Sequence, residues 1–141
     1  MVPYPNWITI NLDHLISNIK YLQSLTPSDC KFLFPVKADA YGHGSLACSW
    51  AATYADIDAL GVAHLFEGVS LREHGSEQEI LVLGPLTEGD FQTCLKYQLT
   101  PTLTRLDTAI AFEKFLKAKS VCHRVHIKVD TGMGRYGFAY D

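Results

Sequence analysis

A lysine at the end of a short apolar run is the residue best placed to do chemistry. Phe32, Phe34 and Val36 precede Lys37, and a turn-forming loop with two glycines follows it. The run is too short for a buried helix and rich in Phe and Val, so it predicts a buried strand. Parallel strands bind ligands at their carboxyl ends, and a desolvated amine there can form a Schiff base with a carbonyl compound. The sequence therefore predicts a reactive amine at Lys37.

A second segment with possible chemistry covers residues 125–130, with the sequence VHIKVD. Alternation puts its apolar side chains on one face and His126, Lys128 and Asp130 on the other. Three ionisable side chains are costly to bury in an open sheet covered on both faces, whereas in a barrel they face the interior. The glycine-rich loop that follows carries Arg135, whose planar guanidinium suits a phenolate or carboxylate oxygen.

Alternating strand and helix patterns supply the framework for these residues. The strand patterns recur at intervals of about 20 to 25 residues, which is typical of parallel α/β folds. Pro101 weakens one of them, because proline cannot donate to a strand ladder. We expect strands at residues 7–10, 32–37, 58–63, 80–84, 99–104 and 125–130, and helices over residues 12–22, 46–51, 66–75, 87–95 and 107–116. Ser45 is expected to cap the second helix, whose apolar side would carry Leu46, Ala47, Trp50 and Ala51.

Two architectures fit this rhythm. A closed (β/α)8 barrel needs eight units and typically about 250 residues, and this sequence has 141. A doubly wound open sheet of five strands would be complete at this length. The polar face of residues 125–130 favours the barrel. We therefore expect a partial (β/α)8 barrel with about five βα units.

The composition excludes several classes of protein. With 48% hydrophobic and 19% charged residues, disorder is excluded for most of the length. The net charge of -3 and the scattered basic residues predict no nucleic-acid partner. The longest apolar run is shorter than the ~18 residues of a membrane span, and the first residues do not resemble a secretion signal. We expect a cytoplasmic protein without a metal site, in which four widely spaced cysteines are buried and reduced: Cys30, Cys48, Cys94 and Cys122.

The two segments resemble those of the alanine racemase family. Residues 36–44, VKADAYGHG, resemble the family's pyridoxal-phosphate attachment motif, and residues 126–135, HIKVDTGMGR, resemble its second segment. Similar blocks occur at residues 7–12, at Glu67 and at residues 80–84. The resemblance covers nearly the whole sequence. It implies that residues 1–141 form an incomplete N-terminal barrel domain, without the family's C-terminal β-domain.

The resemblance also implies roles for individual residues. Lys37 would bind pyridoxal 5'-phosphate as a Schiff base and then act as the base on one face of the substrate Cα. Tyr41 would hydrogen-bond the cofactor phosphate. Arg135 would contact the pyridine 3-oxygen and the substrate carboxylate, and Met133 would form a wall near the substrate. The supporting residues would be Lys128, which is carbamylated in many family members, together with His126 and Asp130.

The implied activity is the interconversion of L- and D-alanine, which supplies D-alanine for peptidoglycan. The cofactor delocalises the carbanion left at Cα, and racemisation needs an acid/base group on each face. In the family the second group is a tyrosine of the partner subunit's C-terminal β-domain, which this sequence lacks. The expected partners are a small amino acid and, as in the family, a second subunit, with neither nucleic acid nor membrane.

Three alternatives stay open. The first is a truncated or split-gene product that is inert or binds pyridoxal phosphate weakly, because an unclosed barrel leaves strand edges unpaired and its mouth open to water. The second is a broad-specificity or serine racemase with the same motifs. The third is a barrel-type amino-acid decarboxylase, which the second segment fits poorly.

Overall fold

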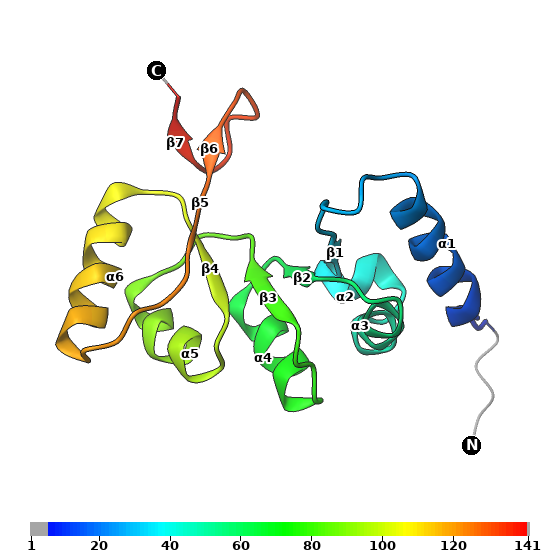
Figure 1. The fold of residues 1–141 in the computed structure, drawn as a ribbon. Helices are drawn as coiled ribbons and strands as arrows, with labels where there is room; N and C mark the ends of the chain where they lie inside the picture. The colour runs from blue at the N-terminus through cyan, green and yellow to red at the C-terminus, as the bar shows by residue number, and fades with distance from the viewer. Residues whose placement is uncertain (1–5, 141) are drawn as a thin grey trace.

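One parallel sheet runs through the computed structural model, which describes residues 6–140 (Figure 1). Each strand pairs with the next one along the chain, whereas a doubly wound sheet reverses its strand order at a central strand. The sequential order confirms a partial (β/α)8 barrel and excludes the doubly wound topology. The strands are β1 (Leu33–Pro35), β2 (Ala59–Val62), β3 (Glu79–Val82), β4 (Thr100–Leu103) and β5 (His126–Ile127).

Helices precede and connect these strands, as the periodicity predicts. A further short pair of strands, β6 (Val129–Asp130) and β7 (Phe138–Ala139), projects beyond β5 (Figure 1). The helices are α1 (Leu12–Ser24) before β1, α2 (Lys37–Gly42) and α3 (Ser45–Tyr54) after β1, α4 (Leu65–Glu73) after β2, η1 (Glu88–Asp90) and α5 (Phe91–Lys96) after β3, and α6 (Leu106–Ala118) after β4.

The core lies between one face of the sheet and the helices. Alternate strand residues pack there against helical side chains, so burial of apolar surface fixes the helices on that face. The buried strand residues include Leu60, Val62, Ile80, Val82 and Leu103, and the helical ones include Leu71, Phe91 and Phe112.

Strand β4 forms and is fully buried although it contains Pro101. All of its residues are buried, and Pro101 lies in register with Val82 of β3. The pairing of β4 with β5 begins only at Thr102. The missing N–H of Pro101 therefore falls where β4 has one neighbouring strand, which is how the sheet accommodates a proline.

Two local expectations are wrong. Residues 7–10 form no strand, and Trp7 and Ile8 are each 83% exposed, because no strand within residues 6–140 pairs with them. Trp50 is also exposed, at 64%, as are Leu46 and Ala47. Of the residues expected on the apolar side of α3, Ala51 is buried as predicted. It shares the buried side of the helix with three other small side chains: Cys48, Ser49 and Ala52.

The predicted strand over residues 125–130 is divided at Lys128. The Lys128 N–H donates to the carbonyl of Leu103 in β4 at 3.0 Å, while the Lys128 carbonyl accepts from the N–H of Phe138 at 2.8 Å. The chain therefore pairs with β4 up to Lys128 and with β7 after it. The predicted alternation holds only from Ile127 onward, since Lys128 and Asp130 are half-buried while Ile127 and Val129 are 68% and 47% exposed. His126, expected on the same face as Lys128, is exposed as well.

The cysteines differ in their environment. Cys48 and Cys94 are buried, as expected, but Cys30 and Cys122 are exposed, so the expectation is wrong for these two. No helix within residues 6–140 is both long and apolar enough to cross a membrane. The same residues contain no group of three or more His, Cys, Asp or Glu side chains arranged to hold a metal ion.

Candidate functional site

Lys37 lies where β1 ends, at the carboxyl edge of the sheet. The ladder with β2 continues to Val36, whose N–H donates to the Gly61 carbonyl at 2.8 Å. Lys37 is half-buried, and its Nζ lies 5.9 Å from the centroid of the Tyr41 ring. No ion pair within residues 6–140 involves Lys37. The amine is therefore positioned by the strand and is not neutralised by a carboxylate.

The residues after Lys37 form a turn of left-handed helix. Ala38, Asp39, Ala40 and Tyr41 have φ angles between 51° and 55°. Four consecutive non-glycine residues in this region are rare, and the left-handed conformation costs about 1–2 kcal/mol per residue. A backbone in this state persists only when its surroundings hold it, and such turns cluster at functional sites. We call residues 37–41 the lysine turn.

Asp39 joins the lysine turn to α3. Its Oδ1 accepts the N–H of Ser45 at 2.7 Å, and its backbone carbonyl accepts the N–H of Gly44 at 2.9 Å. Gly44, with φ 90°, precedes the helix, and Ser45 is its first residue. The expectation that Ser45 caps α3 is therefore wrong, because the side chain of Asp39 supplies the acceptor.

Glu67 joins the lysine turn to α4. Its Oε1 accepts the N–H of Ala38 at 2.7 Å, and its Oε2 accepts the N–H groups of Ala63 at 2.7 Å and His64 at 2.9 Å. The sequence alone predicts no role for Glu67. A Glu at the third position of a helix is a capping-box pattern, which accounts for the bond to His64. Nothing local in the sequence indicates the bond to Ala38, 29 residues away.

The second predicted segment forms a tight loop after β6. Asp130 Oδ1 accepts the N–H groups of Gly132 and Gly134, each at 3.0 Å. These backbone donors, that of Gly134 first, hold the pKa of the Asp130 carboxyl below its usual range. His126 is exposed and Lys128 half-buried. Asp130 is therefore the residue that shapes the loop before Arg135.

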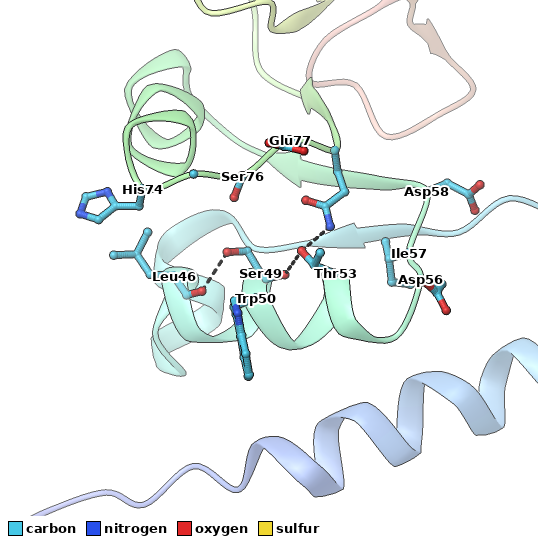
Figure 2. A pocket seen from close by; sticks show the side chains of 12 residues that line it. Leu46, Ser49, Trp50, Thr53, Asp56, Ile57, Asp58, His74, Ser76 and Glu77 are labelled. Carbon is cyan, nitrogen blue, oxygen red and sulfur yellow. Dashed lines mark hydrogen bonds between the residues drawn. The ribbon is translucent and has the colours of Figure 1, made fainter.

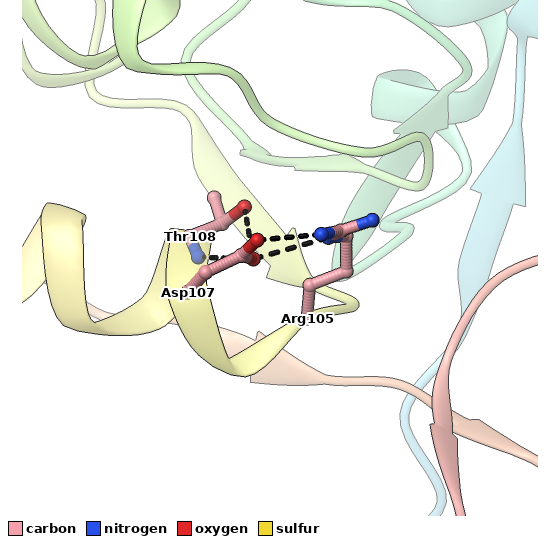
Figure 3. A network of polar contacts seen from close by, with 3 residues as sticks. All are labelled: Arg105, Asp107 and Thr108. Carbon is pink, nitrogen blue, oxygen red and sulfur yellow. Dashed lines mark hydrogen bonds and ion pairs between the residues drawn. The ribbon is translucent and has the colours of Figure 1, made fainter.

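Arg135 and Met133 lie on the surface of this loop. Met133 is 76% exposed, and the Arg135 guanidinium carbon lies 5.7 Å from the centroid of the Tyr136 ring. Another arginine near the same edge of the sheet, Arg105 after β4, is already paired with Asp107 through bonds of 3.0 and 2.5 Å (Figure 3). Arg135 forms no ion pair with residues 6–140. Arg135 is thus the arginine available to an anionic group.

The two segments lie near opposite outer strands of the sheet. Lys37 follows β1 and Arg135 follows β6, beyond β5, and β1 and β5 are the outer strands. Both therefore lie at the carboxyl edge, where barrel enzymes bind ligands. No hydrogen bond or ion pair within the part of the chain described here joins Lys37 or Tyr41 to Arg135. The structure places Lys37 beside Tyr41 and joins the lysine turn to Glu67 through Ala38. Separately, Asp130 binds Gly132 and Gly134 in the loop that leads to Arg135.

The donor groups fit pyridoxal 5'-phosphate. A primary amine without a carboxylate partner suits an aldehyde carbon, and Lys37 supplies one. Phosphate and phenolate oxygens need hydrogen-bond donors or cations, and the phenol of Tyr41 and the guanidinium of Arg135 are exposed. A cavity of about 640 Å³ between α1, β1 and the lysine turn is lined by Pro35, Tyr41 and His43, but neither Lys37 nor Arg135 lines it.

A second groove, of about 620 Å³, lies between α3 and the turn that joins α4 to β3 (Figure 2). Leu46 and Trp50 of α3 line it, as do Asp58 and Gln78. Because Asp58 precedes β2 and Gln78 precedes β3, this groove extends toward the amino-terminal ends of the strands. It is therefore separate from the edge that carries Lys37.

Comparisons with known proteins identify similar chains. A family model described as "Alanine racemase, N-terminal domain" matches residues 10–141. The alanine racemase of Halothermothrix orenii is 40% identical over 133 residues, which are 94% of this chain and 35% of that protein. Alanine racemase of Clostridium difficile 630 in complex with cycloserine has a TM-score of 0.92 and 35% identity, over 99% of this chain and 38% of that chain.

A histidine racemase from Leuconostoc mesenteroides subsp. sake shares the fold more distantly. Its TM-score is 0.82 at 26% identity, over 91% of this chain and 34% of that chain. The curated relatives are about three times as long as the matched region, so the chain spans about a third of their length. The similarity therefore concerns the part of these proteins that corresponds to β1–β7.

Proposed function

This chain belongs to the alanine racemase family, and from that premise we propose that it provides the lysine and part of the cofactor site of an amino-acid racemase. The observation that carries the proposal is the half-buried Lys37 at the carboxyl end of β1, followed by a left-handed turn that Asp39 and Glu67 hold in place. Such an arrangement presents one amine to a ligand at the edge where barrel enzymes react.

Lys37 has two tasks in this proposal. Its amine would hold the cofactor through the aldehyde group and, when free, would take a proton from the substrate Cα or return one on a single face. When bound, pyridoxal 5'-phosphate supplies an electron sink that stabilises the charge left at Cα. The lysine turn keeps the amine on the same side of Cα throughout, which a racemase requires of each of its two acid/base groups.

The other assigned residues bind and orient. The Tyr41 hydroxyl donates to the cofactor phosphate, and the Arg135 guanidinium, aided by the loop that Asp130 shapes, holds the pyridine oxygen and the substrate carboxylate. Lys128 and His126 support this loop from the strand side, and Met133 borders the substrate.

We propose alanine as the substrate, because relatives with 35% to 40% identity are named for it. The product, D-alanine, would serve peptidoglycan synthesis, and the active form would be a homodimer. Exposed reduced cysteines at positions 30 and 122 suit a reducing compartment, which supports a cytoplasmic location. The histidine racemase, which shares the fold, favours a second candidate substrate class, larger amino acids.

The test begins with pyridoxal phosphate alone. The purified chain is incubated with it, scanned for the visible absorbance of an imine, reduced with borohydride and digested for mass spectrometry. We expect the cofactor mass on the peptide that contains Lys37, and no imine in Lys37→Ala. Labelling spread over surface lysines, unchanged in Lys37→Ala, would contradict the proposal.

The second step is an assay of racemisation with L-alanine, L-serine and L-histidine. We expect little turnover by the 141-residue chain, because the assigned residues offer an acid/base group on one face of Cα only. Whatever turnover occurs should be highest with alanine. A clear preference for histidine would support the second candidate.

A further inference from the structure

We infer that Glu67 is a positioning residue for Lys37, an inference that rests on the proposed role of that lysine. The carboxylate of Glu67 accepts three backbone N–H groups, from Ala38, Ala63 and His64, at 2.7, 2.7 and 2.9 Å. It therefore joins the lysine turn, the end of β2 and the start of α4 through a single side chain.

The bond to Ala38 acts on Lys37 directly. The N–H of Ala38 belongs to the peptide unit that follows the Cα of Lys37, and a peptide unit is planar. Fixing that N–H fixes the plane and, with β1 on the other side, the direction of the Lys37 side chain. Beyond this bond the backbone enters its left-handed turn at Ala38, with φ 51°.

A helix cap alone does not account for this geometry. A capping box needs one carboxylate oxygen for the N–H of His64, and Oε2 meets that need while also accepting from Ala63. Oε1 is left for Ala38, which is not part of α4. The same side chain thus performs two separable tasks, one local and one between distant segments.

A pocket borders the contact between Ala38 and Glu67. A cavity of about 360 Å³ lies between the lysine turn and α4, lined by Val36, Ala38, Phe66 and Glu67 among others. No other hydrogen bond within residues 6–140 joins Ala38 to α4. Removal of the carboxylate therefore leaves Ala38 without a replacement contact on that side.

Glu67→Gln separates the two tasks. Glutamine keeps the size of the side chain and is accepted in capping boxes, but it offers one acceptor oxygen and one NH₂ donor. The oxygen can satisfy Ala63 and His64 together, which places the NH₂ against the N–H of Ala38. Glu77→Gln is the matched control, since Glu77 is exposed and forms no hydrogen bond or ion pair with residues 6–140.

Two measurements test the inference. Amide hydrogen exchange by NMR should be about 10- to 100-fold faster at Ala38 in Glu67→Gln, as expected for the loss of a charge-assisted bond, while Leu71 inside α4 stays protected. The rate at which pyridoxal phosphate forms the borohydride-trapped imine at Lys37 should fall about 10-fold. Glu77→Gln should match the wild type in both.

The outcomes distinguish the inference from the proposed function. Wild-type exchange at Ala38 and a wild-type imine rate in Glu67→Gln would overturn the inference. If the wild-type chain forms no imine at Lys37, the proposed function fails, and exchange at Ala38 still decides whether Glu67 holds the turn. If Glu67→Gln loses its helical circular dichroism, the same measurements are made on Glu67→Asp, which keeps the charge but is one methylene shorter.

Discussion

The Oδ1 atom of Asp39 lies 2.7 Å from the backbone nitrogen of Ser45 and accepts its N–H. A side chain in the lysine turn therefore caps the helix that follows it, although the residue directly before that helix, Gly44, has no side chain to offer. The turn and α3 depend on each other, because the helix end satisfies Asp39 while Asp39 fixes the left-handed backbone.

Asp39→Ala should lower the free energy of unfolding by ~1 kcal/mol, the typical effect of losing a helix cap. Asp39→Asn keeps an acceptor oxygen and should lose less. Urea unfolding followed by circular dichroism measures both. Asp29→Ala, at an exposed loop position, is the control and should be silent. Equal losses in Asp39→Ala and Asp39→Asn would count against the cap.

Arg135→Lys should weaken pyridoxal-phosphate binding about 10-fold, because an ammonium cannot hold two oxygens in the planar geometry of a guanidinium. Titration of the imine absorbance gives the dissociation constant. Arg105→Lys is the matched control, since Arg105 is already paired with Asp107 (Figure 3). Equal affinities of the two variants would remove Arg135 from the site.

The loop after β6 should lose its order in acid. Backbone N–H groups of Gly134 and Gly132 lower the pKa of Asp130, so the ionised form is favoured in the folded state. The contribution of Asp130 to stability is therefore complete above the ordinary carboxyl pKa of about 3.9 and is lost as the pH falls through the lower folded value. Amide shifts of Gly132 and Gly134 should follow that titration, and Asp130→Asn should abolish it.

Alkylation should divide the cysteines into two groups. Cys30 and Cys122 are exposed and should react with iodoacetamide in the native protein. Burial, with a smaller effect of Asp90, raises the pKa of Cys94 to about 12, and burial with Asp39 raises that of Cys48, so few thiolates form there. Mass spectrometry after timed labelling checks the order. Early modification of Cys94 would show that the core opens locally.

The contribution of Cys94 to stability depends on pH in the opposite direction to that of Asp130. Its neutral thiol donates to the carbonyl of Leu99 at 2.9 Å, and this contribution is complete below the ordinary thiol pKa of about 8.5. It is lost as the pH rises toward 12. Urea midpoints in the alkaline range should therefore fall less in Cys94→Ala than in the wild type.

Gly84→Ala should destabilise the fold by ~1–3 kcal/mol, the usual range for forced overpacking. A Cβ at Gly84 would lie 2.3 Å from the backbone oxygen of Ala63, at the carboxyl ends of β2 and β3. Gly89→Ala is the control, because the nearest atom there is 3.8 Å away. Thermal unfolding compares the two, and equal melting temperatures would contradict the close approach.

Apolar patterns predicted those elements whose burial is set by their own side chains. The runs that contain β2 and β3 and the stripe of α1 appear in the structure, because neighbouring strands and helices cover them. Strand β4 was harder to predict, since the tolerance for Pro101 depends on where the pairing with β5 begins. The alternation of residues 7–10 predicted a strand that does not form, because it finds no partner strand within the described residues.

Motifs in the sequence mark Lys37 and Arg135 as candidate site residues. The role of Glu67 was not predictable, because its defining bond spans 29 residues and depends on the left-handed turn at Ala38, which no propensity scale predicts for Ala. Likewise, the division of the strand at Lys128 follows from a bond to Phe138 in a later strand.

The left-handed turn also limits which sequences can replace residues 38–41. Its positive φ angles exclude proline and are sterically unfavourable for β-branched side chains, whereas glycine, asparagine and aspartate adopt them with little penalty. A saturation library at these codons, sorted for folded protein, should thus be enriched in those small or amide-bearing types and depleted of valine, isoleucine and threonine. The amino-acid types that survive the selection would therefore indicate that the backbone at these positions is left-handed.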